Sequence, residues 1–87
     1  AALRMYPNPN RGDQLYLSIP ALEADVAAVS VDIHDTFGKR VRSMRIAVQD
    51  GHLNTVIDLE GSLAAGMYVV NITAGERSYT ERLVVQP

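Results

Sequence analysis

Apolar and polar residues alternate with a period of two along most of this chain, which is the pattern of strands that bury one face. Every second residue is leucine or isoleucine in residues 14–19, and valine or isoleucine in residues 29–33. Residues 53–59, 67–74 and 78–86 carry similar apolar runs. We therefore predict short β-strands over these segments.

A further apolar segment, residues 40–49, changes phase along its length. Val41 falls on one face of the alternation, whereas Met44 and the apolar residues after it fall on the other. An extra residue shifts the phase of a strand, so we predict a β-bulge near Arg42 and Ser43. Only residues 21–28 have a composition that favours helix, and this segment is too short to change the fold class.

Turn signals separate the predicted strands. Residues 36–39 lie between two of them. Asp50 and Gly51 form a two-residue signal that predicts a hairpin, because glycine accepts the positive φ of such turns. Gly75 and Glu76 predict another turn. About seven short strands without a long helix between them favour an all-β fold, an antiparallel β-sandwich rather than a parallel sheet.

Residues 63–68 have the layout of a tyrosine corner, in which a tyrosine hydroxyl bonds to the backbone a few residues upstream. Tyr68 would supply the hydroxyl, Gly66 would permit a tight approach of the chain, and Leu63 would fill the core. The motif is typical of Greek-key sandwiches and says nothing about chemistry. It therefore supports the fold class and not a function.

The composition describes one globular domain. The 87 residues are 47% hydrophobic and 21% charged, which fits a single compact fold. A net charge of -2 disfavours a nucleic-acid partner, because phosphates bind basic surfaces. The lack of cysteine excludes disulfides, a thiolate nucleophile and a thiolate zinc site. No apolar run approaches the roughly 18 residues of a membrane span, and the N-terminus lacks the pattern of a signal peptide.

The titratable residues do not form an active site that sequence can identify. His34 lies between Asp32 and Asp35, and imidazole is both a metal ligand and a base near neutral pH. However, Asp32 and His34 share the polar face of an alternating strand, where a solvated cross-strand pair is the ordinary outcome. His52 has no partner at ligand spacing, and the motifs of hydrolases, zinc proteases and nucleotide-binding proteins are absent. We expect no catalysis, no cofactor and no metal.

Three further patterns have structural explanations. Residues 11–13 read Arg-Gly-Asp, an integrin-like triplet composed of common turn residues. Residues 71–73 match the N-glycosylation pattern but fall in the middle of a predicted strand. The basic cluster in residues 39–45 could face an acidic partner, but charges on an exposed strand edge also deter edge-to-edge pairing.

Three blocks of the chain resemble, in their order and spacing, the type A C-terminal sorting domain of the type IX (Por) secretion system. The blocks are Tyr6-Pro7-Asn8-Pro9 with Leu15-Tyr16-Leu17, residues 31–41 with the turn Asp35-x-x-Gly38-Lys39, and Leu63-x-x-Gly66-x-Tyr68 with Glu81-Arg82-Leu83-Val84-Val85. The resemblance covers nearly the whole chain. It implies an immunoglobulin-like β-sandwich in residues 6–87, preceded by a linker remnant in residues 1–5.

The resemblance also implies a function. Members of this family stand at the C-terminus of exported cargo in Gram-negative bacteria and are bound by the outer-membrane translocon. A sortase-like peptidase commonly cuts the linker ahead of the domain and attaches the cargo to anionic lipopolysaccharide. By this resemblance the protein would carry an N-terminally fused cargo through the periplasm to the outer-membrane surface or the medium.

Individual positions can be carried over from the family's motifs. Expected motif and recognition residues are Pro7, Asn8 and Pro9 in the opening turn, Asp35, Gly38 and Lys39 in the middle hairpin, Gly66 and Tyr68 in the corner, and Arg82, Leu83, Val84 and Val85 in the terminal strand. Two positions depart from the family. Arg82 stands where lysine is common, and the chain ends in Gln86-Pro87 without the basic terminal residue of some members.

Two other functions are open at this point. An adhesive or carbohydrate-binding module usually needs an aromatic platform, and a chain with no Trp, one Phe and four Tyr offers little for one. A structural spacer for the preceding domain is the second alternative. For a sorting signal, we expect the terminal strand to be captured by strand addition at a free edge, and the same edge would allow a homodimer by strand exchange.

Overall fold

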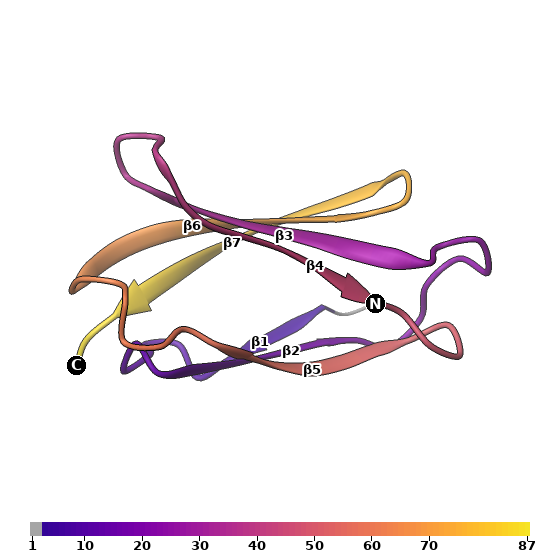
Figure 1. Cartoon of the computed structure of the whole chain (residues 1–87), viewed down its shortest axis with the longest axis horizontal. Coiled ribbons are helices and arrows are strands. Elements are labelled where there is room, and N and C mark those ends of the chain that lie inside the picture. The colour runs from indigo at the N-terminus through magenta and orange to yellow at the C-terminus, as the bar shows by residue number, and fades with distance from the viewer. Residues whose placement is uncertain (1–2) are drawn as a thin grey trace.

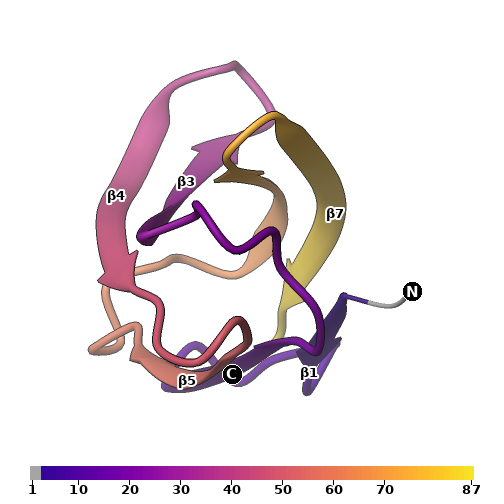
Figure 2. The same cartoon turned by 90° about the vertical axis from the view of Figure 1, so that its right-hand side faces the viewer.

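The structure, a computed structural model that describes residues 3–87, contains two β-sheets packed face to face (Figures 1 and 2). One sheet has the order β1-β2-β5 and the other the order β4-β3-β6-β7, with every pairing between these strands antiparallel. The predicted antiparallel β-sandwich is confirmed. The strands are β1 (Arg4–Tyr6), β2 (Gln14–Ile19), β3 (Ala28–Asp35), β4 (Arg40–Ala47), β5 (Leu53–Asp58), β6 (Gly66–Ala74) and β7 (Arg77–Val85).

The core lies between the sheets and follows from the alternation in the sequence. β2 and β3 turn every second side chain inward, where residues of β5, β6 and β7 meet them. Burying each large apolar side chain is worth about 1.5–3 kcal/mol. The largest fully buried apolar residues are Leu15, Leu17, Ile19, Ile33, Leu59, Ile72, Leu83, Val29, Val31, Val70 and Val85.

The tyrosine corner is confirmed, but its glycine has a different role from the expected one. The Tyr68 hydroxyl donates a hydrogen bond to the Ala64 carbonyl oxygen at 2.6 Å, and Leu63 is buried. A side chain on Gly66 would meet nothing within 4 Å, so no close approach requires glycine there. Its φ of 151° instead lies in the region that favours glycine, so backbone conformation explains this residue.

The turn at Asp50 and Gly51 forms, but the predicted hairpin was wrong. The two residues have φ values of 60° and 72°, and Gln49 pairs with His52 in an isolated bridge. The strands on either side, β4 and β5, belong to different sheets. The turn therefore carries the chain across the sandwich, which a local turn signal cannot reveal.

The β-bulge lies in β4 just before the predicted position. Ile33 pairs with Arg42 and His34 pairs with Arg40, so Val41 is the extra residue. β4 is an edge strand, where bulges are common. Residues 21–27 form a loop and not a helix.

The first strand begins inside the segment that was expected to be a linker remnant. Arg4 pairs with Ser18, and Met5 pairs with Leu17. Ala1 and Ala2, the other part of that segment, lie outside the described residues. Within the folded part of the chain, the three-stranded sheet therefore starts at Arg4.

Candidate recognition site

The chain between β1 and β2 passes from one sheet to the other. β1 pairs with β2, whereas Asn10 forms an isolated parallel bridge with Val85 of β7 in the opposite sheet. Pro7 and Pro9 precede this bridge, and proline has no N–H group that needs a ladder partner. The peptide bonds before both prolines are cis. Residues 7–10, named the opening segment below, therefore join the first strand to the last.

The opening segment covers the outward edge of β7 near the chain end. The Asn8 side-chain amide donates to the Arg82 carbonyl oxygen at 2.6 Å, and the Val84 N–H donates to Asn8 Oδ1 at 3.0 Å. The Asn10 N–H donates to the Val84 carbonyl oxygen, and the Asn10 carbonyl accepts from the Gln86 N–H, both at 2.7 Å. Asn8 thus substitutes its side chain for a strand backbone. The expected free edge is closed over this part of β7.

Asn10 fixes the opening segment from the inside. Its side chain is buried, with 1% exposure. Nδ2 donates to the carbonyl oxygens of Pro7 at 3.2 Å and Gln14 at 2.8 Å, and Oδ1 accepts from the Gly12 N–H at 2.6 Å. These bonds satisfy both polar atoms, as burial requires. The sequence pattern did not identify Asn10, although an asparagine two residues before a glycine is a turn signal.

The Arg-Gly-Asp triplet forms part of the turn that follows. Gly12 is buried, with a φ of 89°, and its carbonyl accepts from the Gly61 N–H at 3.0 Å. The Asp13 carbonyl accepts from the Leu59 N–H at 2.7 Å. Both backbone contacts tie the turn to the loop after β5, which agrees with the structural interpretation of this triplet.

The hairpin between β3 and β4 is organised by the Asp35 side chain. Its Oδ1 accepts from the N–H groups of Phe37 and Lys39, each at 2.9 Å, and Gly38 has a φ of 84°. The Asp35 carbonyl accepts from the Gly38 N–H at 3.1 Å. Asp35 and Gly38 therefore shape the turn, and Lys39 begins the returning chain. Phe37 stands at the tip with 94% exposure.

The four expected recognition residues of β7 divide between its two faces. Leu83 and Val85 point into the core, with 0% and 1% exposure. Arg82 is exposed and Val84 is half-buried, because alternate residues of a strand face opposite sides. Only Arg82 and Val84 can present side chains to a partner while the domain stays folded.

The segments that contain the expected motif residues lie at one end of the sandwich, at the left of Figure 1, where β3 and β7 end and β6 begins. Asp35 pairs with Tyr68 and Tyr68 pairs with Leu83, so the middle turn, the corner and the terminal strand share one row of the sheet. Gly66 pairs with Val85 beyond that row. The opening segment is bonded to the same end of β7. The structure thus places the three sequence blocks at the same end of the sandwich.

The basic cluster in residues 39–45 lies on the edge strand β4 and does not form one surface. The Arg42 guanidinium donates to the carbonyl oxygens of Asp58 at 3.0 Å and Leu59 at 3.3 Å. It also pairs with Glu60 at 3.8 Å. Arg42 therefore fastens the β4 edge to the end of β5 and is not available to an acidic partner.

Two tyrosines on the outer face of the three-stranded sheet stack on each other. The rings of Tyr6 and Tyr16 are parallel within 2°, with centroids 5.3 Å apart, and the Arg4 guanidinium lies 5.8 Å from the Tyr6 ring centre. This stack stabilises neighbouring strands. Because the rings face each other, they do not make a flat platform for sugars.

His34 has a structural partner and no metal-binding set. Its Nδ1 lies 3.3 Å from the Asn71 amide nitrogen on β6. No group of three or more His, Cys, Asp or Glu residues that could hold a metal ion occurs within residues 3–87. Over the same residues, no helix has the length and apolar character needed to cross a membrane.

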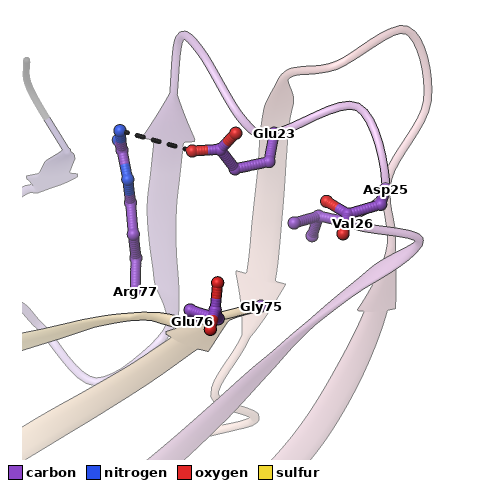
Figure 3. Close-up of a pocket in the computed structure, with 6 residues that line it drawn as sticks. All are labelled: Glu23, Asp25, Val26, Gly75, Glu76 and Arg77. Atoms are coloured by element: carbon purple, nitrogen blue, oxygen red, sulfur yellow. Dashed lines mark ion pairs between the residues drawn. The ribbon is translucent and has the colours of Figure 1, made fainter.

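A pocket at the other end of β7 is lined mainly by charged residues (Figure 3). These residues do not form a set that could bind a metal or carry out catalysis together. Arg77 pairs with Glu23 at 3.7 Å. Tyr79 first, and Glu23 second, raise the pKa of Arg77 above its ordinary value, which leaves the guanidinium charged as before. Gly75 allows the turn to approach the loop, because a side chain there would meet Val26 at 2.9 Å. The pocket therefore lies where the β6–β7 turn packs against the loop before β3.

Comparison with known proteins identifies one similar family. The sequence model of the family described as "secretion system C-terminal sorting domain" matches residues 4–86. No curated protein matches the chain. The family match runs from the start of β1 to the residue after β7, so it spans the whole sandwich described above.

Proposed function

This chain belongs to the family of secretion system C-terminal sorting domains, the signals of type IX secretion, and we propose that it acts by being bound at the outer-membrane translocon, without catalysis of its own. The family consists of sorting signals and is not an enzyme family. The domain sits at the C-terminus of a cargo protein and works with the type IX system. The protein that carries it is exported, either to the cell surface or to the medium.

The observation that carries the proposal is the extent of the family match. It covers residues 4–86, which supports a signal formed by the whole fold rather than by a short tail. Its opening and closing blocks come from opposite ends of the chain and are bonded to each other, Asn8 to Val84. A translocon component that binds this end of the sandwich would contact the first and last parts of the signal together.

We further propose that a sortase-like peptidase at the cell surface removes the domain after the cargo has crossed the outer membrane. The backbone of Arg4 and Met5 is paired with β2, so the cut falls upstream of Arg4. There the C–N bond of the amide breaks and the acyl carbon forms a bond to a nucleophile of lipopolysaccharide. The proton of that nucleophile passes to the departing nitrogen, which becomes the new N-terminus of the domain. The cargo is then held at the outer-membrane surface.

A reporter fusion tests this function. Residues 1–87 are fused to the C-terminus of a soluble periplasmic reporter and expressed in a type IX competent bacterium and in a matched strain without the translocon. We expect the reporter at the surface or in the medium of the first strain only, and a released domain whose N-terminus lies at or before Arg4. A reporter that stays periplasmic in both strains would contradict the proposal and favour a binding module.

We also propose that two copies can form a dimer by strand exchange. The bonds between the opening segment and β7 join residues far apart in the chain, so the opening segment of a second copy could make the same bonds. Size-exclusion chromatography of residues 1–87 should show a dimer whose fraction rises with concentration. A monomer at every concentration would remove this proposal.

A further inference from the structure

The outer face of the four-stranded sheet changes character along its length. Toward the β6–β7 turn it carries amide and hydroxyl groups, from Asn71, Thr73, Ser78 and Thr80. Toward the chain end it becomes apolar. There Met67 pairs with Val84, and Val69 follows Met67 on the same face of β6. We call Met67, Val69 and Val84 the terminal patch.

The terminal patch is accessible. Met67 is 45% exposed, and Val69 and Val84 are half-buried. Directly opposite residues of an antiparallel pair have Cβ atoms about 4.5–5.5 Å apart, so Met67 and Val84 form one continuous apolar surface. Thioether side chains such as that of Met67 adapt to irregular apolar surfaces, which suits a docking contact.

The rim of the terminal patch carries an uncompensated positive charge. Arg82 lies opposite Val69, and its guanidinium makes no ion pair or side-chain hydrogen bond with any residue from 3 to 87. On the other side of Val69 the sheet places His34, and Arg40 lies opposite His34. Asp32 pairs with Arg40 at 3.7 Å, whereas Arg82 has no ion-pair partner among residues 3–87. The whole chain has a net charge of -2, so this charge is local.

The backbone at this end cannot accept an added strand without losing bonds. Asn8 already bonds to the Arg82 carbonyl and the Val84 N–H, and Asn10 bonds to the Val84 carbonyl. A partner that leaves the fold intact must therefore bind side chains on the outer face of the sheet. On β7 these side chains are Arg82 and Val84.

We propose that the terminal patch is the docking surface for a protein of the secretion machinery, one that presents an apolar surface bordered by carboxylates. The proposal rests on the proposed function and names the part of the signal that the secretion machinery contacts. The apolar contact supplies affinity, and pairing of Arg82 with a carboxylate supplies orientation. Leu83 and Val85 act only through the fold that holds the patch in place.

Matched substitutions in the full-chain reporter fusion test this inference. Met67→Ser and Arg82→Glu are each expected to reduce the surface reporter by roughly tenfold or more, as for residues central to an interface. Val56→Ser is the control for Met67→Ser, because Val56 is a strand residue with 47% exposure on the opposite sheet. Arg45→Glu is the control for Arg82→Glu, because Arg45 is exposed on the same sheet away from the patch. Both controls should export normally, and Arg82→Lys should restore export.

Thermal unfolding of the purified domains separates docking from folding. Arg82→Glu should melt close to the wild type, because its side chain makes no bond in the fold, and so it tests docking even if Met67→Ser unfolds. Normal export of folded Arg82→Glu would overturn the docking surface while the wild-type result still supports the sorting function. An equal loss in either control would also overturn it. A wild-type fusion that stays periplasmic would overturn the sorting function, and the docking surface with it.

Discussion

Replacing Asn10 by alanine is expected to lower the free energy of unfolding by about 3 kcal/mol, because buried groups that lose their partners cost about 1–3 kcal/mol each. The substitution removes three hydrogen bonds and leaves the Pro7 and Gln14 carbonyls and the Gly12 N–H without them. Urea denaturation of the purified domain measures the loss. The opening segment should lose its fixed position on β7 at the same time.

Asn8→Ala is the matched control for this prediction. Asn8 also bonds through its side-chain amide, but its bonds are solvent-exposed. Water can replace the lost partner there, so we expect a loss of about 1 kcal/mol. Equal losses in the free energy of unfolding for the two substitutions would show that burial does not explain the contribution of Asn10 to stability.

Leu83→Ala is expected to lower the free energy of unfolding by about 3 kcal/mol, which lies within the range found when a buried leucine is truncated to alanine. Leu83 is fully buried in the core beside the tyrosine corner. Arg82→Ala, one residue away on the outer face, should change stability by less than about 0.5 kcal/mol. Denaturation curves of the two variants under the same conditions make the comparison. Similar losses for both would contradict the assignment of the two faces.

Because Leu83 and Val85 face the core, a deletion of the chain end does not test recognition alone. Removing residues 83–87 would delete Leu83 and Val85 from the core, so lost export would report unfolding as much as lost recognition. Substitutions on the outer face avoid this problem. They leave the inward residues of β7 in place.

Much of the fold follows from local patterns in the sequence. The alternation in residues 14–19 predicts both β2 and its buried face, since a strand turns successive side chains to opposite sides. The tyrosine corner was predictable because its bond joins Tyr68 to Ala64, only a few residues upstream. The family blocks also identified the residues that meet at one end of the sandwich.

What the sequence did not reveal depends on contacts between distant segments. The turn at Asp50 and Gly51 has the residues of a hairpin, yet the strands beside it pair elsewhere. The pairing of Asn8 with Val84 crosses almost the whole chain, and no local signal marks it. The sequence placed Arg42 near a predicted bulge and in a basic cluster, whereas its hydrogen bonds join β4 to the end of β5.

The opening segment closes the edge of β7 through its bonds to Arg82 and Val84. Amide hydrogen exchange tests it directly, with Thr80 as an internal reference, because Thr80 and Val84 both direct their N–H groups away from β6. The Val84 N–H donates to Asn8 Oδ1. Alternate residues of an antiparallel strand direct their N–H groups to the same edge, so the Thr80 N–H points to that edge too. Within residues 3–87 it makes no backbone hydrogen bond outside the strand ladders. We predict strong protection of Val84 and weak protection of Thr80, with the protection of Val84 lost in Asn8→Ala. Equally fast exchange of both amides in the wild type would show that the opening segment does not close the edge of β7.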